Sequence, residues 1–156
     1  MTTVLTTLPP WPRVRRGANG HPVQTLQHLL RHRGHDLVVD GVLGPLTERA
    51  VRASQDAAGL DVDGVVGPAT WSAIVVVVRR GSVGEAVRAV QREAVARDLS
   101  GRPDPVLIVD GQFGPRTEAW VRGFQEALHA GFPEVLVDGV VGPVTWRCLV
   151  SGMLSH

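Results

Sequence analysis

The feature that most limits how this chain can fold is an internal duplication. Residues 14–17, Val-Arg-Arg-Gly, return as residues 78–81 at an offset of 64 positions. Gln27 returns as Gln91 at the same offset. Self-similarity at a fixed distance predicts two copies of one structural unit, and each copy has to bury its own apolar face.

A second element, Asp-Gly-x-apolar-Gly-Pro-x-Thr, occurs four times, twice in each half. The copies begin at Asp40, Asp63, Asp110 and Asp138. Asp and Gly favour a tight turn, since the Asp side chain accepts backbone N–H bonds and Gly tolerates positive φ. Proline is favoured at the first helical position, and a Thr hydroxyl in the first turn can meet free helix N–H groups. Each copy therefore predicts a turn that leads into a helix.

The first helix of each half is expected over residues 21–33 and 84–98. Apolar residues recur there at helical spacing and predict the buried faces. These residues are Val23, Leu26 and Leu30 in the first half, and Val87, Val90 and Ala94 in the second.

The helix after the first motif differs between the halves. The second half carries Trp120, Val121, Phe124 and Leu128, whereas the aligned positions of the first half are Ala50, Val51, Ser54 and Ala58. The first half must therefore fill its core differently or keep a surface cavity. Thr-Trp follows the second motif in both halves, and we interpret Trp71 and Trp146 as core residues.

Composition narrows the class of protein. The chain has 156 residues, 44% of them hydrophobic and 20% charged, which is a globular composition. A formal net charge of +1 argues against a nucleic-acid partner. Residues 1–10 lack the pattern of a secretory signal, and the longest apolar run, residues 73–78, is too short to span a membrane. Cys148, the single cysteine, is predicted to be a core residue.

No catalytic or metal site is predicted. Cys148 has no adjacent His pattern, and the chain has no phosphate-binding Walker loop. His28, His32 and His35 could share a helical face, but an exposed polar face explains them more simply than zinc. Residues 61–64 begin like a calcium loop, yet its twelfth position is Ser72 rather than Glu. We expect neither enzymatic activity nor a cofactor.

Taken together, these segments resemble the peptidoglycan-binding-like module. The resemblance rests on Arg-Gly, the Gln-bearing helix, Val-Asp-Gly-x-Phe-Gly-Pro-x-Thr-Glu, Phe-Gln, and Val-Asp-Gly-Val-Val-Gly-Pro-x-Thr-Trp. It covers about residues 14–78 and 78–151. The first half departs from the pattern, because Ser54 replaces the aromatic residue that Phe124 retains.

The resemblance implies an all-α fold of two tandem three-helix modules, with short extended segments and Asp-Gly turns. We expect an N-terminal extension at 1–13 and modules at 14–77 and 78–152. It also implies non-catalytic binding of bacterial peptidoglycan, glycan strand and stem peptide, at the cell wall or outside the cell. The alternative is an adaptor that uses the same modules on a protein partner inside the cell.

The expected ligand contacts lie in the motif loops and beside nearby arginines. Backbone N–H groups, helix N-termini and guanidinium groups suit the carboxylates and amides of such a ligand. The expected residues are Arg16, Asp40, Gly41, Gly44, Thr47, Asp63, Gly64, Arg80, Asp110, Gly111, Gly114, Arg116, Thr117, Asp138 and Gly139. Among them, Gly44→Val and Gly114→Val are expected to damage folding more than recognition.

Overall fold

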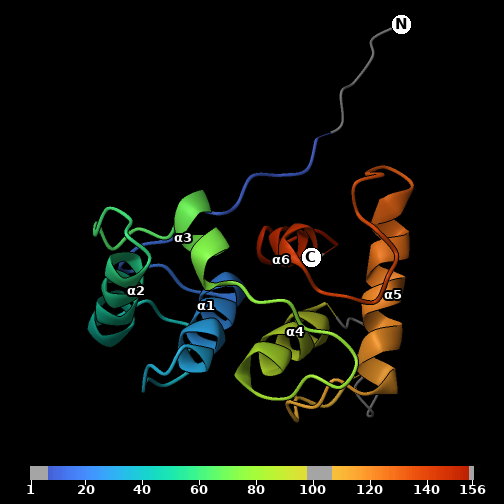
Figure 1. The fold of residues 1–156 in the computed structure, drawn as a ribbon, viewed down its shortest axis with the longest axis horizontal. Coiled ribbons are helices and arrows are strands. Elements are labelled where there is room, and N and C mark those ends of the chain that lie inside the picture. The colour runs from blue at the N-terminus through green and yellow to red at the C-terminus, as the bar shows by residue number, and fades with distance from the viewer. Residues whose placement is uncertain (1–6, 98–106, 155–156) are drawn as a thin grey trace, which may run out of the picture.

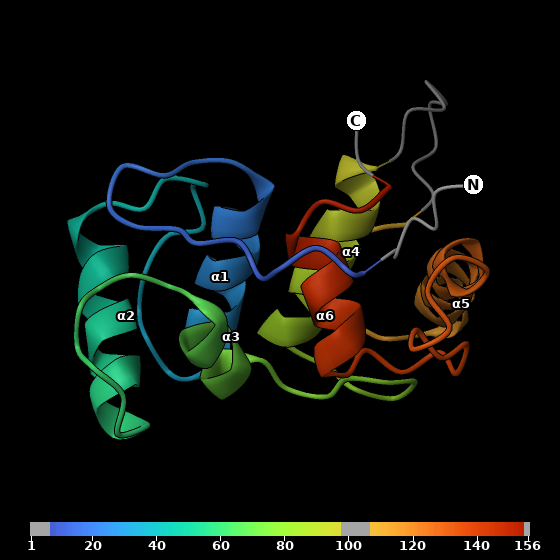
Figure 2. The same cartoon turned by 90° about the horizontal axis from the view of Figure 1, so that it is seen from above.

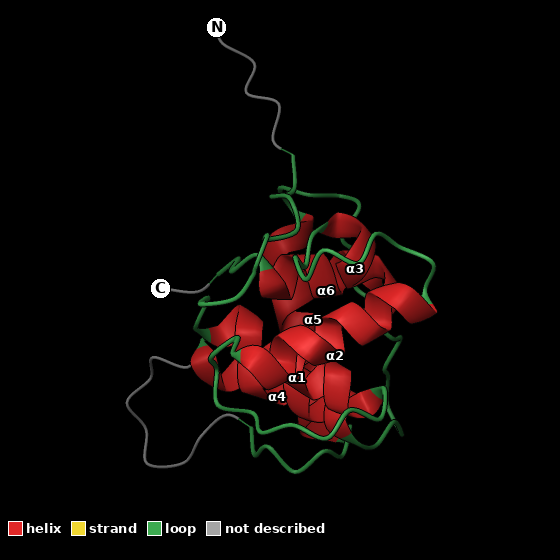
Figure 3. Cartoon of the chain, turned by 90° about the vertical axis from the view of Figure 1, so that its left-hand side faces the viewer, coloured by secondary structure: helices red, strands yellow, loops and turns green. Residues whose placement is uncertain are grey.

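The described part of the chain folds into six helices that are connected by turns and loops (Figure 1). The computed structural model describes residues 7–97 and 107–154. The helices are α1 (His21–His32), α2 (Pro45–Ala57), α3 (Pro68–Ile74), α4 (Glu85–Ala96), α5 (Pro115–His129) and α6 (Pro143–Val150). Within the described residues, β structure amounts to four isolated bridges, and Figure 3 accordingly shows helices and loops. The all-α prediction is confirmed.

The two halves lie side by side as two three-helix units. α1, α2 and α3 form the first module and α4, α5 and α6 the second, with α2 and α5 at opposite ends of the molecule (Figures 1 and 2). α1 packs on α4 at the centre, so the equivalent helices of the two modules face each other. The predicted buried faces are confirmed, since all six of their residues are at most 1% exposed.

Gly-Pro starts the four helices that follow the motifs. Each helix has Gly at the N-cap and Pro at its first position, where the missing N–H costs no hydrogen bond. The φ of Gly44 is −93°, and a Cβ there would meet no other atom within 4 Å. Gly114 is alike, with a φ of −98° and equally open space. Neither backbone is strained and neither Cβ would clash, so steric conflict gives valine no reason to damage folding at these positions; the expectation that it damages folding more than recognition stays a prediction.

Each module closes around its tryptophan. Trp71 and Trp146 are both 0% exposed, which confirms them as core residues. The indole N–H of Trp71 donates to the carbonyl oxygen of Pro12, and that of Trp146 donates to Val76, both at 2.7 Å. Trp11 stacks on Trp71 with ring centroids 5.9 Å apart. The segment before each module is therefore bound to the last helix of that module.

The N-terminal segment also contacts the second module. In α6, Arg147 donates to the carbonyl oxygens of Pro9 at 2.7 Å and Leu8 at 2.9 Å. Leu8 itself is buried against the common core. Residues 8–12 thus connect α3 of one module to α6 of the other, and in Figure 1 the blue segment after the grey N-terminal trace runs above α6 and reaches α3.

His28 lies in the contact between α1 and α4, where it is 3% exposed. The expectation of an exposed polar face is wrong at this position, because α4 covers it. Its Nδ1 lies 2.8 Å from a Glu85 carboxylate oxygen, while Arg92 donates to its Nε2 at 2.7 Å. A ring that accepts at Nε2 and donates from Nδ1 is neutral. Burial lowers the pKa of His28 despite the neighbouring carboxylate of Glu85, so the neutral form is favoured.

Glu93 is a buried carboxylate in the same contact. Its side chain is 0% exposed, yet its carboxylate group has partners from both modules. Arg97 donates to it at 2.6 Å, Thr25 donates its hydroxyl, and the His21 ring lies at 3.0 Å. A buried charge is tolerated only with such partners. The two modules therefore share a polar network as well as an apolar surface.

Candidate functional site

The motif loops are organised by a buried glutamine. In the first copy, Nε2 of Gln27 donates to the Asp40 carboxylate at 2.9 Å, to the Val42 carbonyl at 3.0 Å and towards the Thr47 hydroxyl at 3.2 Å. Its Oε1 accepts the N–H of Gly41 at 2.9 Å. The side chain of Gln27 is thus fully used inside the protein, where it fixes the loop that leads into α2.

The same arrangement occurs in all four copies. We call this set of bonds the glutamine clamp. Its glutamines are Gln27, Gln55, Gln91 and Gln125, which bind Asp40, Asp63, Asp110 and Asp138 and the hydroxyls of Thr47, Thr70, Thr117 and Thr145. The threonine hydroxyls receive the amide of a glutamine, rather than a helix N–H group as predicted. Sequence reasoning missed the glutamines as the centre of the motif, although one stands in the helix before every copy.

In three of the four copies, the clamp favours the ionised form of the aspartate, at Asp40, Asp63 and Asp110. A hydrogen bond from Gln27, helped by the N–H of Val42, lowers the pKa of Asp40 below its ordinary value. The pKa of Asp63 and of Asp110 is lowered mainly by the N–H two residues on, and then by the clamping glutamine. One oxygen of each carboxylate is engaged in this way. The loops therefore present fixed anionic groups at the surface.

Two shallow grooves run beside these loops. One has a volume of about 440 Å³ and brings together four of the expected residues, Asp110, Gly114, Arg116 and Thr117. The other, of about 230 Å³, places Arg13 near Asp63 and Thr70. Both combine a cation with backbone and carboxylate groups, as polar recognition requires.

The other expected arginines lie outside these grooves. Arg16 is exposed, and Arg80 approaches Glu118 at 3.7 Å. Asp40 and Asp138 occupy clamps of their own, away from both grooves. Ligand contact by any of the residues expected from sequence stays a prediction.

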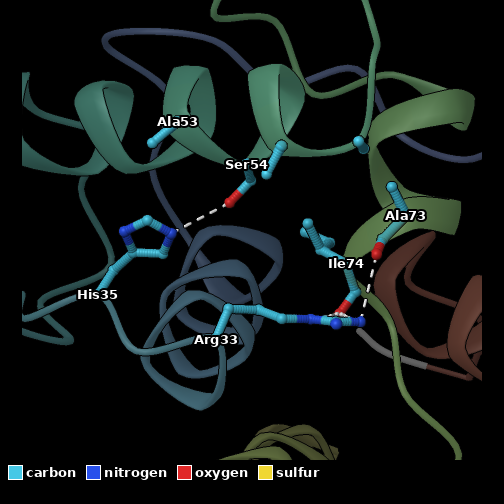
Figure 4. Close-up of a pocket in the computed structure, with 8 residues that line it drawn as sticks. Arg33, His35, Ala53, Ser54, Ala73 and Ile74 are labelled. Atoms are coloured by element: carbon cyan, nitrogen blue, oxygen red, sulfur yellow. Dashed lines mark hydrogen bonds between the residues drawn. The ribbon is translucent and has the colours of Figure 1, made fainter.

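A larger pocket opens in the first module, which agrees with the second of the two alternatives expected from its small residues, a surface cavity rather than a differently filled core. It has a volume of about 500 Å³ and lies between the end of α1, α2 and α3 (Figure 4). The labelled residues Arg33, His35, Ala53, Ser54, Ala73 and Ile74 line it. The His35 ring and the Ser54 hydroxyl approach within 3.3 Å on one side. The small residues of α2 therefore leave a space that has polar groups on its wall.

Aromatic side chains occupy part of the equivalent place in the second module. Phe124, at the position of Ser54, is 5% exposed and stacks on Trp120 with ring centroids 5.2 Å apart. The guanidinium carbon of Arg97, at the position of Arg33, lies 5.2 Å from the centre of the Phe124 ring. A groove of about 400 Å³ remains outside these rings. The two modules thus share a fold but differ at this surface.

The family of putative peptidoglycan binding domains matches residues 19–74 and 83–149. The two matched segments coincide with the two helical units and cover most of the sequence. The chain belongs to this family. In the terms of the family, α1–α3 and α4–α6 are two tandem peptidoglycan binding domains.

Two curated relatives are similar in sequence to this peptidoglycan-binding-domain protein over part of their length. It is 35% identical over 103 residues to a zinc D-Ala-D-Ala carboxypeptidase of Streptomyces albus G, covering 66% of this chain and 36% of the relative. It is 41% identical over 66 residues to an uncharacterized protein of Kitasatospora aureofaciens, covering 42% of this chain and 48% of that protein. The chain therefore spans less than half the length of either relative.

Solved structures also contain similar segments. A peptidoglycan-binding protein from Clostridioides difficile, in complex with glutamine hydroxamate, is 37% identical over 38% of each chain, with a TM-score of 0.38. The SleB N-terminal domain is 42% identical over 38% of this chain and 82% of that one, with a TM-score of 0.37. A Burkholderia AP3 phage endolysin is 23% identical over 92% of this chain and 64% of that one, with a TM-score of 0.40.

The described part of this family member offers neither a metal-ligand cluster nor a membrane-spanning helix. Within residues 7–97 and 107–154, no three His, Cys, Asp or Glu side chains gather as metal ligands would. None of the helices described here is long and apolar enough to cross a bilayer. Cys148 is 0% exposed, as predicted, and burial raises the pKa of its thiol to about 11.

Proposed function

We propose that this chain binds bacterial cell-wall peptidoglycan through its two modules and does not cleave it. The observation that carries the proposal is the family match, which covers both helical units rather than one. Peptidoglycan offers hydroxyls, amides and carboxylates, and a binder for it needs directed donors in shallow grooves. The grooves beside Asp63 and Asp110, each with an arginine on its wall, meet that description.

The groove beside Asp110 is the better candidate contact. Arg116 stands in the first turn of α5, where exposed N–H groups and a guanidinium suit a carboxylate of the stem peptide. The exposed Ile108 lines the same groove and adds an apolar contact. When two modules bind one polymer at the same time, the chain is held more tightly than by either site alone, so a weak site in each module suffices.

The absence of cleavage is part of the proposal and rests on how the reactive side chains are used. The Cys148 thiol is buried and protonated at neutral pH, since its pKa is raised to about 11. His28 is neutral but bound on both ring nitrogens by Glu85 and Arg92. Neither group can reach a substrate as a nucleophile or base.

Co-sedimentation with purified insoluble cell walls tests the proposal. The folded chain should pellet with the walls, whereas an unrelated protein of similar size and charge should stay in the supernatant. The supernatant should contain no released wall fragments by mass spectrometry, and their steady release would contradict non-catalytic binding. Recovery of the chain in the supernatant, with walls of several chemistries, would instead favour an adaptor that binds a protein.

A further inference from the structure

The pocket of the first module contains a cation without a carboxylate partner. Nε and Nη2 of Arg33 donate to the carbonyl oxygens at the end of α3, those of Ala73, Ile74 and Val75, at 3.1–3.3 Å (Figure 4). These bonds fix the guanidinium at the pocket wall. Across the described residues, no carboxylate lies within 4.0 Å of it, and Nη1 donates to no described group. The guanidinium is therefore held in position by backbone carbonyls, and no described carboxylate neutralises its charge.

In the second module, the equivalent arginine pairs with a carboxylate of the helix that precedes it. Arg97 donates to the end of α6, to the carbonyl oxygens of Leu149 and Met153 at 2.8 Å, as Arg33 does to the end of α3. However, its Nη1 also binds the Glu93 carboxylate, four residues earlier, at 2.6 Å. The residue four positions before Arg33 is the apolar Leu29.

The two modules thus differ at two residues around this arginine. The first has Leu29 and Ser54, which leave its arginine unpaired and its pocket open. The second has Glu93, which pairs the arginine, and Phe124, whose ring lies against the guanidinium in the wall of a groove of about 400 Å³. Both differences favour an anion in the first module, because its arginine has no described carboxylate partner and a serine hydroxyl stands where the second module has an aromatic ring.

We propose that the pocket of the first module binds the free C-terminal carboxylate of a short peptide of small residues. Arg33 would receive the carboxylate through Nη1, since arginine forms strong charge-assisted bonds with carboxylates. The Ser54 hydroxyl offers a further donor or acceptor for the peptide, and Ala53 and Ala73 leave room for methyl side chains. A volume of about 500 Å³ lies in the range of small-molecule sites. The assignment of this peptide to the stem of peptidoglycan rests on the function proposed above.

Titration of the 15N-labelled full chain with a defined peptide tests the site. The probe is N-acetylated Lys-D-Ala-D-Ala, and its C-terminal amide is the matched ligand without the charge. The free acid should shift the amide signals of Ser54 and Ala73, and the amide should bind roughly tenfold more weakly or worse. Signals of the equivalent region around Phe124 should stay in place. Equal binding of acid and amide, or shifts confined to the second module, would overturn the proposal.

Three variants separate the pocket from the fold. Ser54→Phe copies the second module and should abolish the shifts, and Arg33→Gln should weaken binding of the free acid roughly tenfold. Arg49→Gln is the control, because Arg49 is exposed on α2 and its side chain makes no hydrogen bond or ion pair with any described residue. It removes the same charge and should bind as the parent does. Melting curves confirm that each variant is folded, and full binding by folded Ser54→Phe would contradict the site.

Wall sedimentation of the same variants distinguishes the two proposals. Walls that retain the parent, with no peptide shifts at the pocket, would remove this site and leave wall binding intact. Peptide binding that depends on Arg33, by a chain that walls do not retain, would keep the carboxylate site and remove its assignment to peptidoglycan. Failure of both measurements would remove both proposals.

Discussion

The side chain of Gln27 binds Asp40 through Nε2 at 2.9 Å while its Oε1 accepts the N–H of Gly41, and Gln91 repeats both bonds with Asp110 and Gly111. A side chain that serves a carboxylate and a backbone N–H together joins a helix to the loop after it. Each module has two glutamine clamps, one before its second helix and one before its third.

Substitution of a clamping glutamine should destabilise the fold. Gln27→Leu retains the volume but leaves the N–H of Gly41 and the Thr47 hydroxyl without their partner in the interior. Each unsatisfied buried group costs about 1–3 kcal/mol, so we expect a loss of about 2–4 kcal/mol in the free energy of unfolding. Urea denaturation measures it. Gln24→Leu on the same helix is the control, since Gln24 makes no hydrogen bond to another described side chain; equal losses in both variants would contradict the role of the clamp.

The turn glycine and the cap glycine of a motif should respond oppositely to serine. Gly41 has a φ of 76°, and an added Cβ would lie 3.2 Å from the Gln24 side chain. Gly41→Ser should therefore lose about 1–2 kcal/mol. Gly44 has an extended φ and open space, and serine is a preferred N-cap residue, so Gly44→Ser should leave stability unchanged or raise it slightly. Thermal melts compare the two, and a larger loss at Gly44 would refute this distinction.

The elements of the fold that depend on neighbours in the sequence were predictable. The start of α2 follows from Gly44-Pro45, and the buried face of α1 follows from its apolar spacing. The pocket of the first module was one of the two alternatives that the comparison of Ser54 with Phe124 left open. In each case one local rule, or one comparison between the halves, determined or narrowed the outcome.

Features that depend on distant contacts were not predictable in the same way. The clamp joins residues 13 positions apart in the first copy but 19 apart in the third, so it follows no fixed spacing. The signal that could have revealed it was the glutamine in the helix before each motif. The burial of His28 depends on α4 of the other module, and nothing in its own helix indicates that contact.

Removal of Glu93 should destabilise the contact between the modules. Its carboxylate binds Arg97, Thr25 and His21, and Glu93→Ala leaves a nearly buried guanidinium, 5% exposed, without its counter-ion. Loss of one partner of a buried pair costs about 3–5 kcal/mol. Glu118→Ala is the control, because Glu118 meets Arg80 and Arg122 near the surface at 3.7–3.9 Å and should cost less than about 1 kcal/mol. Chemical denaturation that found similar costs for both would contradict the network.

The stability of the chain should decrease in mild acid because of His28. In the folded state its pKa lies below the ordinary value of 6.5, mainly through burial, so the unfolded chain binds the proton more readily. The contribution is therefore fully present above pH 6.5 and is lost as the pH falls towards the folded pKa. Protonation at Nε2 would also remove the acceptor that Arg92 uses, and it would add a charge beside Arg31. His28→Gln cannot take up this proton, so its midpoint of urea unfolding should vary less than that of the parent between pH 7 and about pH 5. Parallel pH curves for the two proteins would show that another group is responsible.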